Sequence, residues 1–120
     1  MRTLATLTII FAFLPLTASA QTSAPNSAAE IVEWSWRTEP DFGADGAVRV
    51  AGQVKNIGDE PIYHVEVKFT TLDGDGKVLT TEVALAQSIP VGATGSFEQR
   101  ADYYGSEEKA RIRVIQVYYR

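Results

Sequence analysis

The stretch from Val48 to Leu79 constrains the fold of this chain most strongly, because apolar and polar residues alternate along it in short blocks. Two blocks flank the sequence NIGDEP, and a third follows DGDG. A period of two residues places one set of side chains on a buried face and the other in water, as in antiparallel strands. Connections this short join only neighbouring strands. The stretch therefore predicts a β-meander.

The alternation also predicts which side chains of the meander face inward. Its three strands are expected over residues 47–56, 62–72 and 77–85. The expected inward residues of the first two strands are Val48, Val50, Val54, Tyr63, Val65, Val67 and Phe69. A common face of the third strand carries Leu79, Thr81, Val83 and Leu85. Gly52 falls on the inward set, which indicates a bulge or a close approach by another backbone or a large ring, such as a tryptophan of the preceding strand.

Further strands are predicted on both sides of the meander, over residues 31–38, 94–101 and 110–119. In the first, Val32, Trp34 and Trp36 share one face. The last strand changes phase near Val114 and Ile115, and either a β-bulge at this point or burial of both faces explains the change. No stretch carries a long helical period. The chain is therefore expected to be all-β, an immunoglobulin-like antiparallel β-sandwich of six or seven strands.

The N-terminus has the pattern of a secretory signal peptide. Arg2 is followed by an apolar run and by a small-x-small end at Ala18 and Ala20. The run is shorter than the roughly 20 residues that a membrane span needs. We expect a signal peptide over residues 1–20, cleaved after Ala20, rather than an uncleaved anchor. This predicts a periplasmic or secreted protein without a membrane span.

The remaining chain is expected to form a flexible leader and one domain. Residues 21–29 (QTSAPNSAA) are small and polar, as in a leader, and residues 30–120 match the size of one sandwich. The absence of cysteine excludes a lipid-anchoring cysteine and disulfide bonds. Without Arg2 the chain has ten basic against fifteen acidic residues, a formal charge of −5. Such a charge argues against nucleic acid and anionic membranes as partners.

A series of residues in the central stretch repeats a known pattern. They are Val50-x-Gly52-x-Val54-x-Asn56, Gly58-Asp59, Val65-x-Val67-x-Phe69, Asp73 with Gly74-Asp75-Gly76, Val91-Gly92 and Gly95-x-Phe97. Over residues 48–97, about half of the mature chain, the sequence resembles the FxLYD domain, an immunoglobulin-like module of exported bacterial and archaeal proteins. Phe69 and Asp73 hold their places in that signature, whereas Thr71 and Leu72 replace its leucine and tyrosine. The resemblance implies a binding module without catalytic residues.

The acidic turn DGDGK is the one stretch with the appearance of a ligand loop. Carboxylates at i and i+2, here Asp73 and Asp75, begin a calcium loop. The full pattern needs further ligands and a distant glutamate, whereas here a strand follows at once. Asp-Gly pairs are typical of hairpin turns. We therefore expect a hairpin turn, with Asp73 and Asp75 as a weak candidate for a metal site.

Little in the sequence indicates an enzyme. His64 is the only histidine, it lies on the outward phase of its strand, and no cysteine is present to complete a metal site. No serine occupies a nucleophile-elbow pattern. We expect no catalytic residues and no cofactor, and nothing in the sequence indicates an oligomeric state.

The aromatic residues outside the meander are the candidate binding residues. Trp34, Trp36, Tyr103 and Tyr104 belong to the residue types favoured at recognition surfaces, as do Tyr118 and Tyr119 of the last strand. For the two tryptophans the alternative is that they seal the edge of the core. The chain is thus expected to be an exported, non-enzymatic binding module of the bacterial cell envelope, with another envelope or secreted protein as partner. The alternatives are a carbohydrate-binding module, a calcium-dependent module, or an inhibitor that inserts residues 39–46 or 102–109 into a secreted enzyme.

Overall fold

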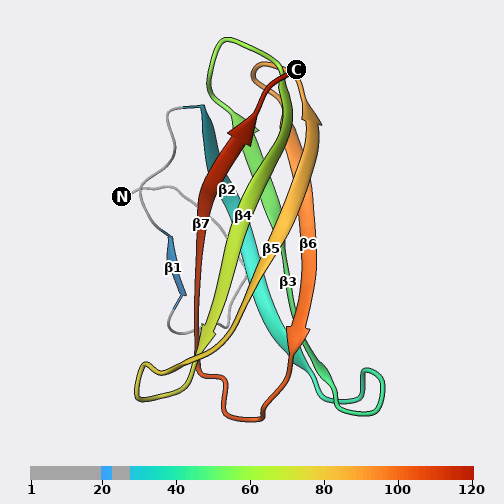
Figure 1. Ribbon diagram of the computed structural model, residues 1–120, viewed down its shortest axis with the longest axis vertical. Helices are drawn as coiled ribbons and strands as arrows, with labels where there is room; N and C mark the ends of the chain where they lie inside the picture. The colour runs from blue at the N-terminus through green and yellow to red at the C-terminus, as the bar shows by residue number, and fades with distance from the viewer. Residues whose placement is uncertain (1–19, 23–27) are drawn as a thin grey trace.

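The computed structural model describes residues 20–22 and 28–120. This part of the chain forms seven strands and no helix (Figure 1). The strands are β1 (Ala20–Thr22), β2 (Ala29–Glu39), β3 (Ala47–Asn56), β4 (Ile62–Leu72), β5 (Val78–Ile89), β6 (Thr94–Asp102) and β7 (Lys109–Tyr118). The predicted signal peptide lies outside the described residues except for Ala20, and so does most of the predicted leader.

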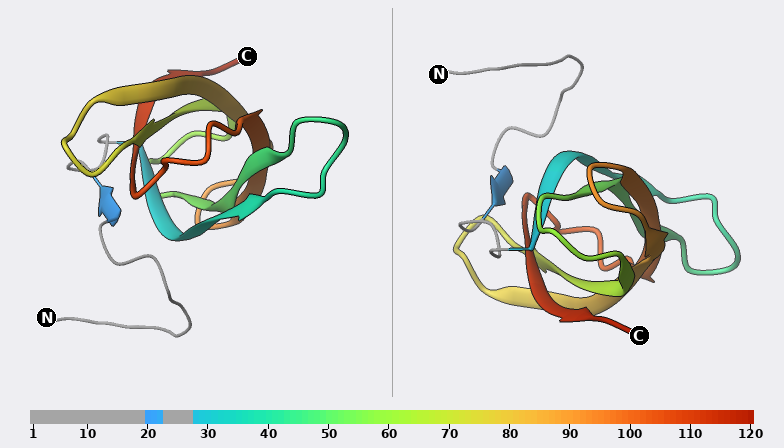
Figure 2. Two further views of the ribbon diagram at one scale, coloured as in Figure 1. Left: turned by 90° about the horizontal axis from the view of Figure 1, so that it is seen from below. Right: turned by 90° about the horizontal axis from the view of Figure 1, so that it is seen from above.

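The strands form two sheets, with the orders β1-β7-β4-β5 and β2-β3-β6. The six strands β2 to β7 pair in antiparallel fashion, whereas β1 pairs parallel to β7 over three residues. Seen along the long axis, the two sheets curve around one shared interior (Figure 2). The described chain is therefore all-β and sandwich-like, as the alternation predicts.

The meander supplies the centre of the core. Val50, Val54, Val65, Val67 and Phe69 are all fully buried in a single apolar cluster. The structure confirms the predicted bounds of β3 and β4 and the inward phase of these five residues. Burying side chains of this size from both sheets is the main source of stability in a domain without disulfide bonds.

Gly52 lies at a close approach, as predicted. A Cβ atom at this position would stand 2.6 Å from Cζ of Phe97, 2.8 Å from Cβ of Trp34 and against the backbone oxygen of Glu33. The ring above the glycine belongs to Phe97 of β6, so the large ring does not come from the preceding strand. Any larger residue here would force β2 and β6 away from β3.

Asn56 ties the end of β3 to the opposite sheet. Its side-chain amide donates hydrogen bonds to the backbone oxygens of Glu60 (2.8 Å) and Ile89 (2.9 Å). Its side-chain oxygen accepts one from the amide of Gly58 (3.0 Å). The side chain is fully buried, and these bonds replace the water that it loses.

Thr71 places a hydroxyl in the interior, where the resemblance to the FxLYD signature implies an apolar residue. Its hydroxyl oxygen lies 2.6 Å from that of Thr80, its partner across β4 and β5. The pair satisfies both hydroxyls, so a buried polar residue fits this position without an unpaired group.

The predicted bulge in the last strand is confirmed. Glu66 pairs with Gln116 and Val67 pairs with Val114, which leaves Ile115 as the extra residue. On both sides of the bulge β7 therefore turns an apolar set inward, and burial of both faces is not needed to account for the sequence.

Two predicted faces need correction. Val32 does not share a face with Trp34 and Trp36, because the register of β2 shifts between Ile31 and Glu33 and leaves Val32 exposed. Val83 and Leu85 share a face of β5, as predicted, and it is the outer face of the sheet. Ala84 and Ala86 fill the inner positions, and their small side chains give a weaker hydrophobic signal.

The second correction concerns Tyr63, which is 43% exposed rather than buried. Ile62 and Ile89 take the inward places at this end of the sheet. Ser88, next to Ile89, has a φ of +56°, a left-handed conformation that interrupts the extended strand. The alternation therefore fails at the start of β4, where Tyr63 joins the surface.

Candidate binding surface

The two tryptophans that the sequence marks as binding candidates pack against the core. Trp34 and Trp36 are partly buried and both contact the apolar cluster. The indole nitrogen of Trp36 is buried without a hydrogen-bond partner among the described residues. The alternative interpretation, that these residues seal the edge of the core, accounts for their positions.

Tyr103 and Tyr104 separate into one packed and one exposed ring. Tyr103 contacts the core, and its Cδ2 atom lies 2.9 Å from the position of a Cβ at Gly46. Tyr104 is 60% exposed. The carboxylate of Glu107 accepts hydrogen bonds from the amides of Tyr104 and Gly105, which fixes the loop between β6 and β7. Tyr104 alone of the four candidates is exposed.

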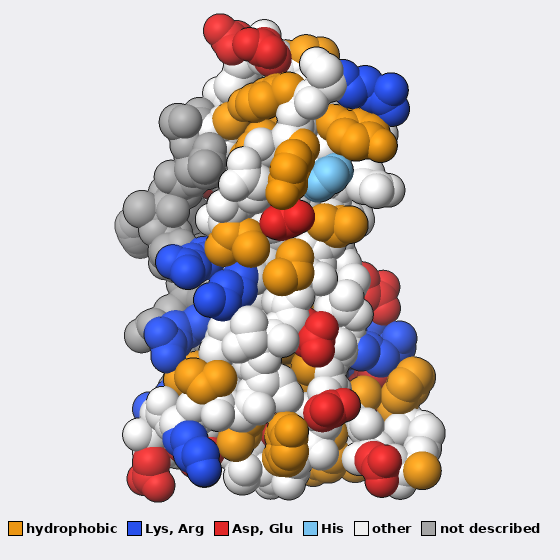
Figure 3. Space-filling model, in the orientation of Figure 1, with side chains coloured by type: hydrophobic (Ala, Val, Ile, Leu, Met, Phe, Trp, Pro, Cys, Tyr) orange, Lys and Arg blue, Asp and Glu red, His pale blue; other side chains and the backbone are white. Residues whose placement is uncertain are grey.

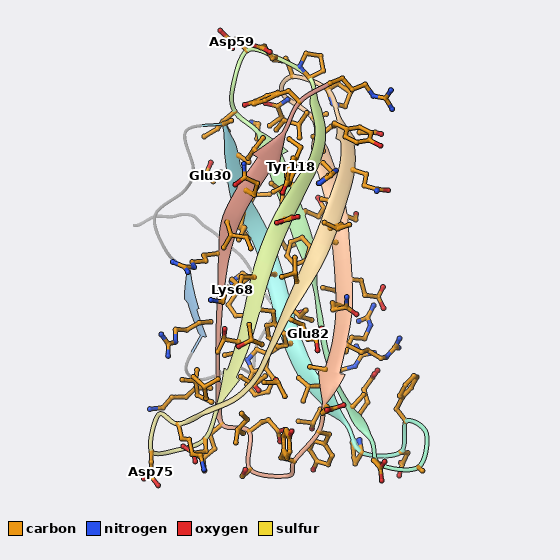
Figure 4. All side chains as sticks on the ribbon, in the orientation of Figure 1. Glu30, Asp59, Lys68, Asp75, Glu82 and Tyr118 are labelled. Atoms are coloured by element: carbon orange, nitrogen blue, oxygen red, sulfur yellow. The ribbon has the colours of Figure 1, made fainter. Side chains whose placement is uncertain are left out.

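The DGDG segment has the geometry of a hairpin turn. One carboxylate oxygen of Asp73 accepts hydrogen bonds from the amides of Asp75 and Lys77, both at 2.9 Å. Asp75 lies at the tip of this loop (Figure 4). Within the described residues, no group of three or more His, Cys, Asp or Glu side chains is placed to hold a metal ion. Asp73 thus acts on its own backbone.

A surface of which sequence reasoning named only Tyr118 lies at the other end of β4, on the outer side of the sheet. It consists of Tyr63, His64, Leu85 and Tyr118, and we call it the aromatic patch. The ring centroids of His64 and Tyr118 are 4.2 Å apart, and those of Tyr63 and His64 are 5.2 Å apart. Figure 3 shows hydrophobic side chains gathered around the histidine. The patch combines large rings with polar ends, the composition favoured at interfaces.

Two charged residues lie beside the rings of the patch, Arg120 at Tyr63 and Glu66 at Tyr118. The guanidinium of Arg120 lies 4.5 Å from the ring centroid of Tyr63. Loss of solvent, together with the charge of Glu66 and a hydrogen bond to it, raises the pKa of the Tyr118 phenol. His64 lies on the outer face as predicted, but it is half-buried between two rings rather than free in solvent.

The patch depends on pairings that the sequence does not display. His64 and Tyr118 are more than fifty positions apart and meet because β4 and β7 pair. Leu85 comes from β5, where it lies opposite Glu66 of β4. The available signal was the excess of tyrosine at the C-terminus, combined with the outward phase of His64.

The outer side of the β2-β3-β6 sheet carries a different arrangement. Arg37, Arg49 and Arg100 lie in one row across its three strands, and we call them the arginine row. Glu39 pairs with Arg37 (2.9 Å) and with Arg100 (3.0 Å), while Glu98 pairs with Arg49 (2.7 Å). Hydrogen bonds from Arg100 and Arg37 lower the pKa of Glu39.

The loops proposed to enter an enzyme lie at one end of the molecule, together with the DGDG turn (Figure 1). In the loop between β2 and β3, Phe42 is 49% exposed, and the centroid of its ring lies 4.3 Å from the guanidinium carbon of Arg100. This end is remote from Tyr118, which Figure 4 places at the opposite end of the sheet from Asp75. The loops and the aromatic patch therefore do not form one site.

Comparison of the chain with protein-family models, with curated proteins and with solved structures finds no match. The resemblance to the FxLYD domain accordingly rests on the residues quoted for it. In the part of the chain that the structure describes, no helix has the length and apolar character needed to cross a membrane.

Proposed function

We propose that this protein is an exported, non-enzymatic binding module of the bacterial cell envelope, and that it binds another protein through the aromatic patch. The observation that carries the proposal is the exposure of large apolar groups on a regular sheet face. Tyr63 and Leu85 are 43% and 45% exposed beside the ring pair of His64 and Tyr118. Rigid rings presented by paired strands offer a large contact area at little entropic expense.

The strand order supports an immunoglobulin-like fold and the proposed kinship with the FxLYD domain. An immunoglobulin-like sandwich places strands A, B and E in one sheet and strands C and F in the other. When β2 to β7 take the places A, B, C, C′, E and F, the observed orders β2-β3-β6 and β7-β4-β5 follow. Thr71 differs from the signature residue, but its pairing with Thr80 makes the difference structurally acceptable.

A carbohydrate ligand is the second candidate, because tyrosine rings stack on sugars. The position of Arg120 favours a protein instead. Its guanidinium already lies over the ring of Tyr63, where a flat sugar face would need to stack. A protein side chain can contact the free edges of the patch without displacing it.

The test is affinity capture from the envelope fraction with the mature chain as bait. Three baits are compared: the wild type, the double variant Tyr63→Ser/Leu85→Ser, and Tyr104→Ser, which removes an exposed ring at the opposite end. We expect the wild type and Tyr104→Ser to retain the same protein and the double variant to lose it. Retention by the double variant, or loss with Tyr104→Ser alone, contradicts the proposal.

A further inference from the structure

The sheet that bears the aromatic patch also bears a row of three cations. Lys68 of β4 lies directly opposite Arg113 of β7, and Arg111 stands two positions along on the same face. We call these three residues the basic row. None of them forms an ion pair within the described residues. Figure 3 shows Lys and Arg side chains gathered over the middle of β7, and Figure 4 places Lys68 there.

In the arginine row on the other sheet, glutamates of the same chain neutralise three cations that lie side by side. There, Glu39 and Glu98 stand beside the three arginines and pair with each of them. Like charges directly opposite each other across two strands are destabilising. The basic row keeps this repulsion in a chain that has more acidic than basic residues. An anionic partner would relieve this repulsion by bringing opposite charge to the row.

The edge of β7 next to this row already accepts an extended segment. β1 pairs there in parallel, with Gln21 opposite Arg111 and Thr22 opposite Ile112. The pairing covers three residues, one of which is Ala20, the last residue of the predicted signal peptide. The sequence around β1, QTSAPNSAA, contains no acidic residue and cannot neutralise the row. The edge is therefore competent for strand addition, and its present occupant lacks the matching charge.

We propose that the basic row and the adjoining edge of β7 bind an extended, acidic segment of the partner protein as an added strand in place of β1. This inference rests on the proposed function and names the chemistry of its partner. A parallel strand in the register of β1 places one residue beside Arg111 and the residue two positions later beside Arg113. The segment is thus one with carboxylates at alternate positions.

Peptide binding to the mature chain tests the proposal. The probe is a short labelled peptide in which glutamate and valine alternate, measured by fluorescence anisotropy at low and high ionic strength. Two matched peptides replace either the glutamates by lysine or the central valine by proline, which removes a backbone donor and keeps the charge. We expect the acidic peptide to bind in a salt-sensitive manner and the other two to bind at least about tenfold more weakly.

Variants of the chain separate charge from structure. Arg111→Gln/Arg113→Gln should weaken binding of the acidic peptide about tenfold, whereas Arg111→Lys/Arg113→Lys should nearly retain it. The glutamine variant should unfold at the same or a higher denaturant concentration than the wild type, because repulsion in the row is relieved. A marked loss of stability would instead assign the row a structural role and overturn the proposal.

Other outcomes also overturn the inference. Equal binding of the proline peptide excludes strand addition, and binding only to phosphatidylglycerol vesicles assigns the row to a membrane. In the envelope capture, retention by the glutamine variant with loss by Tyr63→Ser/Leu85→Ser defeats this inference and leaves the proposed function standing. Retention by both variants defeats the proposed function itself.

Discussion

The outer faces of the two sheets differ in whether their charged side chains are paired and in how much apolar surface they expose. On the β2-β3-β6 sheet, three arginines in a row are each paired with a glutamate. On the β7-β4-β5 sheet, the cations of the basic row have no ion-pair partner among the described residues, and the aromatic patch lies exposed beyond them. A face whose charges are already paired offers a partner fewer unpaired groups to bind. The second face keeps unsatisfied groups that a partner can satisfy, and this difference is the basis of the proposed function.

The largest loss of stability is expected from a substitution in the core that lies between the two sheets. Phe69→Ala removes a fully buried ring from the core under both sheets and should lower the free energy of unfolding by about 3–5 kcal/mol. Chemical denaturation monitored by circular dichroism measures the loss. Thr70→Ala, at the neighbouring outward position, is the control and should change stability far less. A small loss for Phe69→Ala would mean that the two faces do not rest on a common core.

The next effect concerns the link between the sheets. Asn56→Ala should lower the free energy of unfolding by about 2–3 kcal/mol, because the buried backbone oxygen of Ile89 loses its donor. The exposed neighbour Lys55 gives a control in Lys55→Ala. If both variants unfold at the same denaturant concentration, the hydrogen bonds of the Asn56 side chain do not stabilise the contact between the two sheets.

A third substitution separates the role of the aromatic patch in binding from its contribution to stability. His64→Ala removes the ring between Tyr63 and Tyr118 and should lower stability by less than about 1 kcal/mol, since the patch lies outside the core. The same variant should weaken partner binding. Gln87→Ala, opposite His64 on β5, serves as the control. Unfolding caused by His64→Ala would show that this end of β4 belongs to the core.

The smallest effect is expected on the paired face and depends on pH. The pKa of Glu39 is lowered by Arg100 and Arg37, so its ionised form is the one that folding stabilises. That contribution is present above the ordinary value of 4.5 and is lost as the pH falls through the lower pKa of the folded state. Glu39→Gln should therefore be less stable than the wild type at neutral pH and equal to it in strong acid.

Urea denaturation across a pH series measures this difference. Glu82→Gln is a suitable control, because Glu82 is exposed and forms no ion pair within the described residues. A difference between Glu39→Gln and the wild type that stays constant with pH would show that the ion pairs of Glu39 do not stabilise the fold.

Sequence alone predicted the parts of this molecule that depend on local pattern. The bounds of β3 and β4 follow from unbroken alternation, and the bulge at Ile115 follows from a change of phase within one strand. The close approach at Gly52 was predicted because an inward position without a side chain leaves space that a neighbouring ring or backbone fills. These signals lie within a few residues of the feature that they predict.

The parts that failed depend on partners far away in the sequence. Tyr63 is turned outward beside the left-handed Ser88 of another strand. The shared face of Val83 and Leu85 was predicted without saying whether it is the inner or the outer one, and that depends on Ala84 and Ala86 facing inward. The aromatic patch requires the pairing of His64 with Tyr118, which no local pattern records. Of the four candidate residues named from sequence, only Tyr104 is exposed, because aromatic content does not distinguish rings that seal a core from rings that face a partner.

The bulge at Ile115 has a consequence for how β7 can tolerate the loss of one residue. Because Ile115 has no partner of its own, loss of one codon here would leave Val114 and Val117 inward and Tyr118 outward. The same loss in the unbroken alternation of β3 would reverse every later side chain of that strand. Related chains that differ by one residue at this point can thus present the same surface, and their alignment should place its gap here.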